Sequence, residues 1–304
     1  MIHAFIINQH AGIGGFAAEI REHLSRRKDI EYYIFHTRRE GGESDVAREI
    51  MNLFEGEKVR IYCCGGSGTL TNALNGVDDL SKVEIAFYPK GLTNDFLKVF
   101  GEDENKFTEL DAMIDGECAQ IDYIETSDGI SLNTFSVGID SSFGKKMRDV
   151  EALNVFGNMV PYLVSFIYAA FVAKTEEYEV EVDGEKYTGK FSEVFFGNGG
   201  TIGGALCFED KPDITDGLGK TVIFKGLPSF RILRLFINLA KKRLDKCEGK
   251  EFDGFGKSIS IKRCDNKAFV MNYDGEFRSV KKSFTARIVP KGLNFVLPKG
   301  VELK

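Results

Sequence analysis

The sequence predicts an α/β plus β architecture, with an N-terminal parallel α/β domain and a C-terminal antiparallel β-sandwich domain. Apolar strand-like and helix-like segments alternate up to about residue 115, which is typical of a mostly parallel sheet. From Ala119 onward the pattern changes to many short strand-like segments separated by turn signals, which indicates antiparallel pairing. We therefore expect one domain over residues 1–120 and a second over residues 121–285.

Composition sets the broad class. The chain has 304 residues, of which 43% are hydrophobic and 28% charged, as in a globular protein with ample core. A net charge of −6 argues against general affinity for nucleic acid. The six cysteines show no metal-ligand spacing and no signal peptide is visible, so we expect free, buried thiols and a cytoplasmic protein.

The first part of the chain contains four predicted strands and their helices. The strands are expected at residues 2–8, 31–36, 59–64 and 85–88. Two amphipathic helices are expected at residues 16–26 and 45–54, a third with Thr69 as its N-cap, and a fourth opened by Thr93-Asn94-Asp95.

A glycine loop follows the third strand directly. Gly65, Gly66 and Gly68 let the backbone turn sharply, and a helix N-terminus just after such a loop attracts phosphate through its N–H groups and dipole. A tight turn without a ligand is an equally good interpretation of the glycines alone. A second polar loop, Pro89-Lys90-Gly91, ends the next strand, and two such loops favour a ligand crevice at the carboxyl edge of the sheet.

The second part contains further strands and two notable helical segments. Residues 178–182 and 186–189 are expected to form a hairpin around Asp183-Gly184. Met159–Ala173 has 15 uncharged residues, short of the roughly 20 that span a membrane, and is interpreted as a buried or interfacial helix. Residues 229–246 form an amphipathic basic helix, which is either a solvated face or a docking site for anionic lipid headgroups. Other strands are expected at 119–126, 131–140, 191–197, 220–224, 258–263, 268–271, 283–289 and 293–297.

The two loops of the first part resemble those of the diacylglycerol kinase catalytic domain family, the soluble bacterial lipid kinases in particular. Gly65-Gly66-Ser67-Gly68-Thr69 matches the family's GGDGT, and residues 89–96 match its P-x-G-T-x-N-D-F. The sequence departs from the pattern at Ser67, where the family has aspartate, at Leu92, where it has threonine, and at Thr71-Asn72, where Asn-Glu is usual. The resemblance extends from Asn8 to Glu276 and implies ATP and Mg²⁺ as cofactors.

The resemblance implies a nucleotide site in the first domain, on which the C-terminal tail, residues 286–304, would pack. Thr37 lies where the family has a nucleotide-contacting threonine, and Asn8 and Gly12 match the family's opening motif. The nucleotide-binding residues carried over are Asn8, Gly12, Thr37, Gly65, Gly66, Ser67, Gly68, Thr69, Thr93 and Asn94.

The resemblance also places catalytic and metal sites on two acidic turns, each of which is as simply interpreted as a plain turn. Asp274-Gly275-Glu276 matches the family's D-G-E, whose glutamate is the general base, so Glu276, with Asp274 and Asp95, forms the implied catalytic set. Asp216 matches an aspartate that, with two backbone carbonyls, holds a structural Mg²⁺, which implies Asp213, Asp216 and Leu218 as ligands.

Two functions follow from these residues. The first is ATP-dependent phosphorylation of a lipid hydroxyl on a diacylglycerol-like acceptor, with Met159–Ala173 beside an apolar cavity open towards Glu276. The second is a non-catalytic nucleotide- or lipid-binding relative, because Ser67 carries no charge. The expected partners are a lipid substrate and the inner membrane surface, through residues 229–246. A homodimer is left open.

Overall fold

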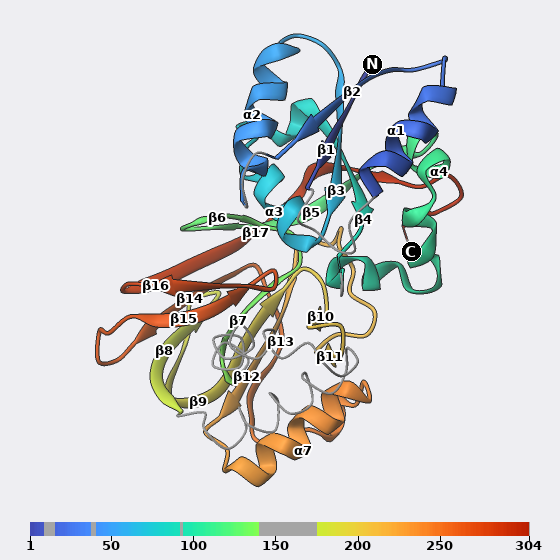
Figure 1. The fold of residues 1–304 in the computed structure, drawn as a ribbon. Coiled ribbons are helices and arrows are strands. Elements are labelled where there is room, and N and C mark those ends of the chain that lie inside the picture. Colours follow the sequence, from blue (N-terminus) through green and yellow to red (C-terminus); the bar gives the residue numbers. More distant parts are fainter. Residues whose placement is uncertain (9–15, 38–40, 92–93, 140–174, 304) are drawn as a thin grey trace, which may run out of the picture. The chain divides into compact units, whose positions relative to one another are not determined.

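The computed structural model describes residues 1–8, 16–37, 41–91, 94–139 and 175–303. The chain divides into two compact units, drawn in Figure 1. The first contains residues 1–123, 213–216 and 289–304, and the second contains residues 124–212 and 217–288. Strands of the first unit pair in parallel and those of the second are antiparallel, so the predicted fold class is confirmed.

The first unit is built on a parallel sheet. Its strands are β1 (Ile2–Ile7), β2 (Glu31–His36), β3 (Val59–Gly65) and β4 (Val83–Pro89). Their order is β4-β3-β1-β2, and the C-terminal half of β17 (Ser283–Leu297) pairs with β4 in parallel. Every residue of β1, β3 and β4 is buried, as expected where helices cover both faces of a parallel sheet.

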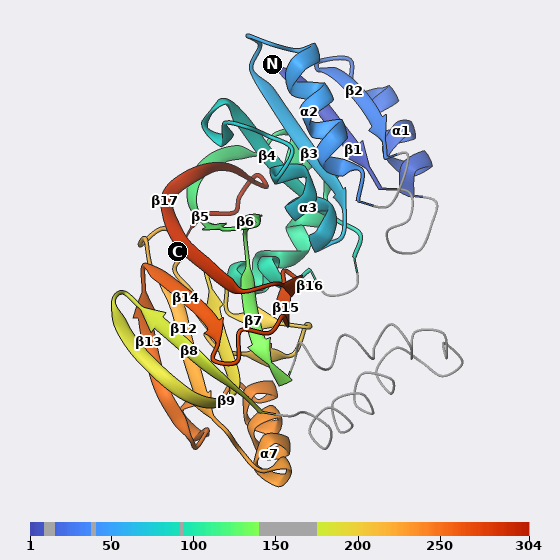
Figure 2. The ribbon, with the colours of Figure 1, turned by 90° about the vertical axis from the view of Figure 1, so that its left-hand side faces the viewer.

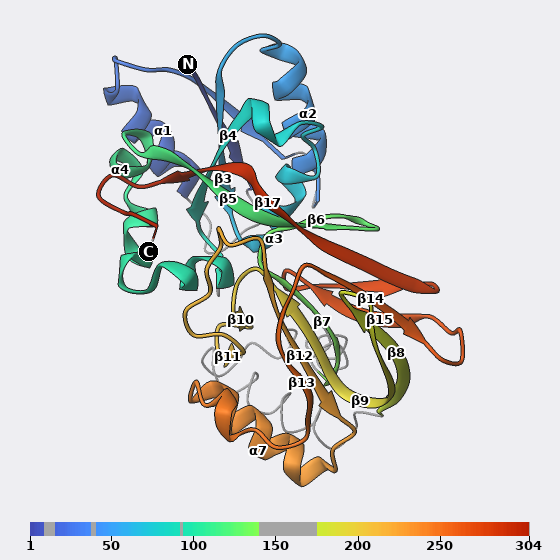
Figure 3. The ribbon, with the colours of Figure 1, turned by 180° about the vertical axis from the view of Figure 1, so that it is seen from behind.

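Helices cover the two faces in the way that right-handed crossovers require. From β1 the chain moves outward to β2 through α1 (Phe16–Arg26), then returns past β1 to β3 and β4 through α2 (Glu43–Leu53) and α3 (Ser67–Leu74). A reversal of direction puts α1 on one face and the other two on the opposite face, as Figures 1 and 3 show. The reversal lies between β1 and β3, where open α/β sheets bind ligands.

Two helix starts differ from the expected ones. The third helix begins at Ser67 with Gly66 as its N-cap, two residues before the predicted cap Thr69. The second begins at Glu43 rather than residue 45, and Glu43 is buried. After β4 the chain continues through the kinked 3₁₀ segment η2 (Asp95–Thr108), α4 (Leu110–Ile114) and β5 (Glu117–Thr126). The short η1 (Leu80–Lys82) precedes β4.

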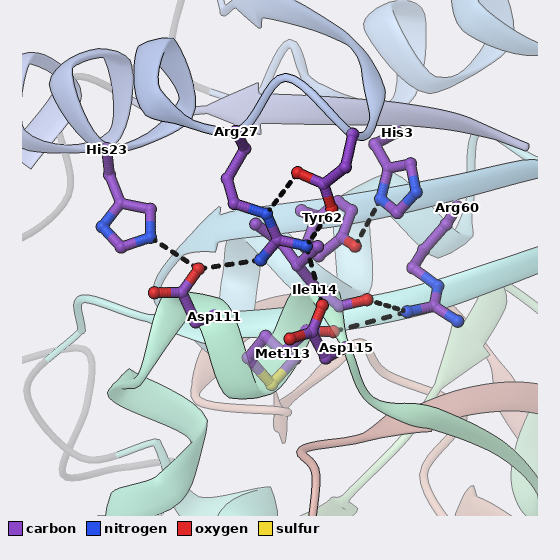
Figure 4. Close-up of polar contacts among 10 residues, drawn as sticks. His3, His23, Arg27, Arg60, Tyr62, Asp111, Met113, Ile114 and Asp115 are labelled. Carbon is purple, nitrogen blue, oxygen red and sulfur yellow. Dashed lines mark hydrogen bonds and ion pairs between the residues drawn. The ribbon is translucent and has the colours of Figure 1, made fainter.

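An ionic cluster ties the end of α1 to α4, as Figure 4 shows. The Arg27 guanidinium donates to Asp111 at 2.8 Å and to Asp115 at 2.7 Å, and the His23 ring lies 3.0 Å from the same Asp111 carboxylate. Side-chain hydrogen bonds to Asp29 and Asp115 raise the pKa of Arg27 above its usual value. This cluster holds two helices that are more than 80 residues apart in sequence.

A second polar network is buried at the amino end of the sheet (Figure 4). Arg60 donates to Glu84 at 2.7 Å and to the Ile114 carbonyl at 2.9 Å, and so caps the end of α4. Beside it the His3 Nδ1 lies 2.7 Å from the Tyr62 hydroxyl. Burial, with Arg60 nearby, lowers the pKa of His3 to about 4. This edge is opposite the one that carries the glycine loop.

The second unit is an antiparallel sheet of strands in the order β16-β15-β7-β9-β8-β14-β17, with β12 pairing with β9 and β13. The turn at Asp183-Gly184 has φ of 48° and 91°, which fits the expected two-residue hairpin. Strand bounds are β6 (Gly129–Ser131), β7 (Thr134–Gly138), β8 (Glu176–Val182), β9 (Glu185–Gly197), β10 (Thr201–Ile202), β11 (Leu206–Cys207), β12 (Gly219–Lys225), β13 (Lys250–Gly256), β14 (Ser258–Arg263), β15 (Phe269–Tyr273) and β16 (Glu276–Val280).

One helix of the second unit, α7 (Ser229–Ala240), packs beside β9 and β12 in Figures 1 and 2. Its apolar residues share a buried cluster with Phe195 of β9 and Phe224 of β12. The helix predicted over 229–246 ends at Ala240, since Lys242 has a φ of 55°, and the short η4 (Leu244–Lys246) follows. Leu239 is therefore the last buried residue of the helix.

Other expectations need correction or fall outside the described residues. Strands β10, β11, β13 and β16 were not predicted, and segments 283–289 and 293–297 form the single strand β17. None of the six cysteines is in a disulfide, but Cys118 and Cys264 are exposed rather than buried. Met159–Ala173 lies outside the described residues. Within the described part of the chain, the helices are too short or too polar to span a bilayer.

Candidate functional site

The glycine loop after β3 leads directly into the N-terminus of α3. The first backbone hydrogen bond of this turn runs from the Leu70 N–H to the Gly66 carbonyl, at 3.3 Å. The N–H groups of Ser67, Gly68 and Thr69 therefore have no acceptor within the helix. Together with the helix dipole, they form a site that favours a phosphate.

Two loops approach each other closely at this edge. The Lys90 N–H donates to the Gly65 carbonyl at 2.7 Å. A Cβ on Gly65 would lie 2.3 Å from the Thr69 Oγ1, and one on Gly91 would lie 2.7 Å from the Gly66 Cα. A Cβ on Gly66 would meet the Gly91 Cα at an ordinary 3.5 Å. Gly65 and Gly91 are therefore required by packing within the fold, and Gly66 is not.

Three buried side-chain oxygens follow three strands of this sheet. They are the Thr37 Oγ1 after β2, the Ser67 Oγ after β3 and the Asn94 Oδ1 after β4, and the described part of the chain offers none of them a hydrogen bond. Leaving a buried polar group unpaired costs about 1–3 kcal/mol, so each such group requires an explanation. All three lie at strand ends on the carboxyl edge, where a polar ligand would satisfy them.

A buried carboxylate that the sequence did not reveal lies beside the loop. Glu43, only 1% exposed, accepts from the Asn8 Nδ2 at 2.8 Å and lies 3.4 Å from the Thr69 Oγ1. The Asn8 amide also donates to the Thr69 hydroxyl at 3.1 Å, and the Asn72 amide reaches Glu43 at 3.5 Å. These bonds join the end of β1 to α3 across the point where strand order reverses. An acidic residue in a first helical turn is common, so nothing in the sequence marked Glu43 as buried.

The remaining predicted residues of the first unit are spread around this edge. Asp95 is 7% exposed and opens η2, directly after Asn94. Asp122 of β5, which was not among the predicted site residues, is fully buried, and its carboxylate accepts from the Lys291 N–H at 2.7 Å. Of the predicted nucleotide-binding residues, Gly12 and Thr93 lie outside the described residues. The other eight lie at the carboxyl ends of β1 to β4, in the loops that follow, or in the first turn of α3.

In the second unit, Asp274 organises the turn before β16. It is buried, has a φ of 49°, and accepts hydrogen bonds from the Ser131 hydroxyl at 2.7 Å and from three backbone N–H groups at 2.9–3.1 Å. Those N–H groups belong to the segment that leads into β7, residues 132–134. The carboxylate thus fixes the backbone from which Glu276 projects.

Glu276 is the first residue of β16, and 40% of its side chain is exposed. The Arg278 guanidinium donates to its carboxylate at 3.1 Å and lies 4.0 Å from the centre of the Tyr273 ring. Arg278 therefore restrains the Glu276 rotamer while one side of the carboxylate stays open to solvent. The arrangement allows a group outside the chain to reach this carboxylate.

Two asparagines lie near the Asp274 turn. The Asn198 amide donates to the Leu132 carbonyl at 3.2 Å, and the Asn133 amide donates to the Thr201 carbonyl at 3.1 Å. The Asn133 Oδ1 is buried and receives no hydrogen bond from the described residues. Asn133 was not among the predicted site residues, although it lies within the strand expected at residues 131–140.

The predicted magnesium turn is stabilised in part by its own side chains. The Asp213 carboxylate accepts from the Thr215 N–H at 2.8 Å and from the Thr215 hydroxyl at 2.7 Å, and Gly217 has a φ of 76°. Side-chain clusters of three or more His, Cys, Asp or Glu suited to a metal do not occur among the described residues. The predicted donors, the Asp216 carboxylate and the carbonyls of Asp213 and Leu218, are the oxygen type that Mg²⁺ prefers. This ion remains a prediction.

Comparison with known proteins agrees with the geometry of the first unit. Residues 3–126 match the family model of the diacylglycerol kinase catalytic domain. This part of the chain is therefore similar to that family. A protein of Staphylococcus aureus (strain bovine RF122 / ET3-1) named "Putative lipid kinase SAB0675c" is 26% identical over 97% of this chain and 94% of its own. One of strain MSSA476, "Putative lipid kinase SAS0691", is 25% identical over the same shares.

Solved structures share the fold along the whole chain. A crystal structure titled as a putative diacylglycerol kinase from Bacillus anthracis str. Sterne has a TM-score of 0.74 at 20% identity, covering 99% of this chain and 98% of that one. A second, titled as a diacylglycerol kinase from the same organism, has a TM-score of 0.70 at 18% identity and the same coverage. The similarity therefore includes the second unit, which the family model does not reach.

Proposed function

We propose that this protein is an ATP-dependent lipid kinase that phosphorylates a hydroxyl group of a diacylglycerol-like lipid. The observation that carries the proposal is the carboxyl edge of the first sheet. There, three buried oxygens that receive no hydrogen bond from the described residues, a helix N-terminus and two glycine loops lie in a chain whose residues 3–126 match a kinase family model.

In this proposal, one set of residues binds the nucleotide and another residue removes the proton of the lipid hydroxyl. The N–H groups of residues 67–69 hold phosphate oxygens, while Thr37 and Asn94 supply side-chain oxygens to the nucleotide. Glu276 accepts the proton of the lipid hydroxyl as its oxygen bonds to the γ-phosphorus, and the bond to the β–γ bridging oxygen breaks to release ADP. When bound, Mg²⁺ supplies the charge that neutralises the phosphates.

Ser67 supports a second candidate, a nucleotide-binding relative without catalysis. Its hydroxyl cannot provide the charge of the family's aspartate, and the loss of one such electrostatic contact commonly costs several kcal/mol at a transition state. Asp95 and Glu43 are buried carboxylates on the same sheet edge that could provide the charge instead. We favour the kinase because both of these carboxylates are present.

The deciding experiment is transfer of radiolabelled phosphate from ATP to a panel of hydroxylated lipids. We expect wild-type transfer and a loss of at least about 100-fold in Glu276→Gln, because general bases contribute about 10²–10⁴-fold. Glu57→Gln, at an exposed position of the first unit, is the matched control and should keep full activity. Ser67→Asp should raise turnover.

A binding measurement separates the two candidate functions. If wild type and Ser67→Asp bind an ATP analogue but transfer no phosphate to any lipid, the protein is the non-catalytic relative.

Asp274→Asn should lower the free energy of unfolding by about 1–3 kcal/mol, since a buried hydrogen-bond network is broken, whereas Glu276→Gln should not. Equal stability of the two variants would remove the positioning role given to Asp274.

A further inference from the structure

Helix α7 has apolar side chains on two faces. Ile232, Leu235, Phe236 and Leu239 are buried in the core of the second unit. On the opposite side Phe230 is 70% exposed and Ile237 is 46% exposed, and Leu233 between them is partly exposed. Positions i, i+3 and i+7 share one helix face, so these three form a single stripe. A helix that is apolar on both sides is normally covered on both sides.

Basic residues flank that stripe. Arg234 and Lys241 lie on the same side of the helix by their spacing, and both are exposed. We call Phe230, Leu233, Arg234, Ile237 and Lys241 the outer face of α7. The surrounding segment, residues 217–244, has no Asp or Glu, in a chain of net charge −6. Its seven Lys and Arg residues are Lys220, Lys225, Arg231, Arg234, Lys241, Lys242 and Arg243.

The charge of this region is only partly neutralised within the protein. Four of the seven basic residues have carboxylate partners. Lys220 pairs with Glu209 and Asp253, and Lys225 pairs with Glu251. Arg234 lies 3.6 Å from Glu248, and Lys242 lies 2.6 Å from Asp210. In the parts of the chain that the structure covers, no carboxylate lies within ion-pair distance of Arg231, Lys241 or Arg243. A local positive surface with an exposed apolar stripe thus stands out on an acidic protein.

We propose that the outer face of α7 docks on the surface of a bilayer that contains anionic lipids. Apolar side chains of such helices enter the boundary between headgroups and acyl chains, while Lys and Arg contact the anionic headgroups. The helix has 12 residues, about 18 Å in length, so it lies along the interface and does not cross it. The inference rests on the proposed function in one respect: a kinase that acts on a lipid meets its acceptor at a membrane.

Charge selects this partner over a second copy of the chain. A two-fold interface through α7 would place the same basic patch against itself. Like charges brought together in this way repel, whereas an anionic bilayer attracts the exposed residues Arg231, Lys241 and Arg243.

The test is binding of the full chain to vesicles of zwitterionic lipid with or without about one-third phosphatidylglycerol. We expect binding only with the anionic lipid, and weaker binding at higher salt. Removing the two basic residues of the outer face in Arg234→Gln/Lys241→Gln should weaken the partition coefficient about 30-fold, at about 1 kcal/mol per charge. Phe230→Ser/Ile237→Ser should weaken it by at least about tenfold.

Matched controls lie on other exposed positions. Leu53→Ser removes a leucine that is 61% exposed on α2, and Lys281→Gln/Lys282→Gln removes two exposed charges; both should bind vesicles as wild type does. Wild-type binding by both α7 double variants would overturn the proposal. So would a loss of self-association in those variants without a change in vesicle binding, which would assign the face to a dimer.

A separate assay keeps this test apart from the kinase hypothesis. With a short-chain acceptor dispersed as monomers, the α7 variants should transfer phosphate at the wild-type rate. If no variant transfers phosphate but vesicle binding behaves as expected, the kinase proposal fails and the docking surface stands. If transfer to the short-chain acceptor falls in the α7 variants alone, α7 acts on the fold and the docking proposal is overturned.

Discussion

At the residue scale, the glycine motif separates into positions with different physical roles. Gly65 and Gly91 are fixed by contacts inside the protein, because any Cβ there would lie within 2.9 Å of a neighbouring atom. Gly66 has room for a methyl group and a φ of −87°, which any residue adopts. The two sequence motifs present these glycines alike, and only the folded structure distinguishes a glycine required by a neighbouring backbone from one that leaves room for a ligand.

This difference gives a prediction for single substitutions in the loop. Gly65→Ala should lower the free energy of unfolding by about 1–3 kcal/mol through overpacking against Thr69 and should weaken binding of an ATP analogue. Gly66→Ala should leave stability within about 0.5 kcal/mol of wild type. Gly66→Asp should fold but lose the nucleotide, since a carboxylate would face the phosphates. Thermal unfolding and calorimetric titration measure both quantities, and ATP-analogue binding by Gly66→Asp at wild-type affinity would make the loop a plain turn.

At the element scale, the two edges of the parallel sheet have opposite characters. Among the described residues, polar side-chain atoms at the carboxyl edge lack hydrogen-bond partners, whereas the buried charges of Arg60 and Glu84 at the amino edge are paired with each other. Buried charges that are paired and hydrogen-bonded typically have a structural role. Polar atoms without partners, at the point where the strand order reverses, are typical of a binding site.

His3 makes the amino edge sensitive to acid. Burial is the main cause that lowers the pKa of this ring to about 4, from 6.5. The unfolded chain therefore takes up a proton at a higher pH than the folded protein does. The free energy of unfolding should fall as pH decreases from about 6.5 to about 4, by up to about 3 kcal/mol from this residue alone.

The measurement is urea unfolding, followed by circular dichroism, of wild type and His3→Gln across this pH range. The two stabilities should converge towards pH 4, because the variant has no group to protonate there. Tyr62→Phe removes the hydrogen-bonding hydroxyl but keeps the burial, so it should retain the wild-type slope. Parallel curves for wild type and His3→Gln would show that His3 takes up its proton equally in both states.

The elements also show what the sequence could predict. The pattern of apolar residues located all four parallel strands and α1, because the apolar residues of each element follow a single spacing along the sequence. The pattern missed β13, whose residues alternate between partly buried and exposed. It also extended α7 past Lys242, because the sequence gives no sign of the left-handed φ of this residue. Glu43 was missed because its partners, Asn8 and Thr69, lie 35 and 26 residues away and only folding brings them together.

At the scale of the whole molecule, the chain returns to its first unit at the end. Residues 289–304 belong to that unit, although residues 124–212 and 217–288 form the other. The segment 293–297 was predicted as a strand, but its partner was not, because Asn294 pairs with Glu84 across 210 positions. Phe295 is fully buried there, with its ring 5.4 Å from Phe96 and 6.2 Å from Phe107.

The last strand should therefore be essential for a stable nucleotide-binding unit. Phe295→Ala should lower the free energy of unfolding by about 3–5 kcal/mol, the usual cost of a large cavity, and should weaken ATP-analogue binding because η2, which follows Asn94, packs on this ring. Phe255→Ala is the matched control: its side chain is 50% exposed on β13, and it should cost less than about 1 kcal/mol and leave binding unchanged. Denaturant unfolding and calorimetric titration compare the two. If Phe295→Ala unfolds and binds nucleotide as Phe255→Ala does, the returning strand adds nothing to the unit, and β4 alone supports the edge that carries Asn94.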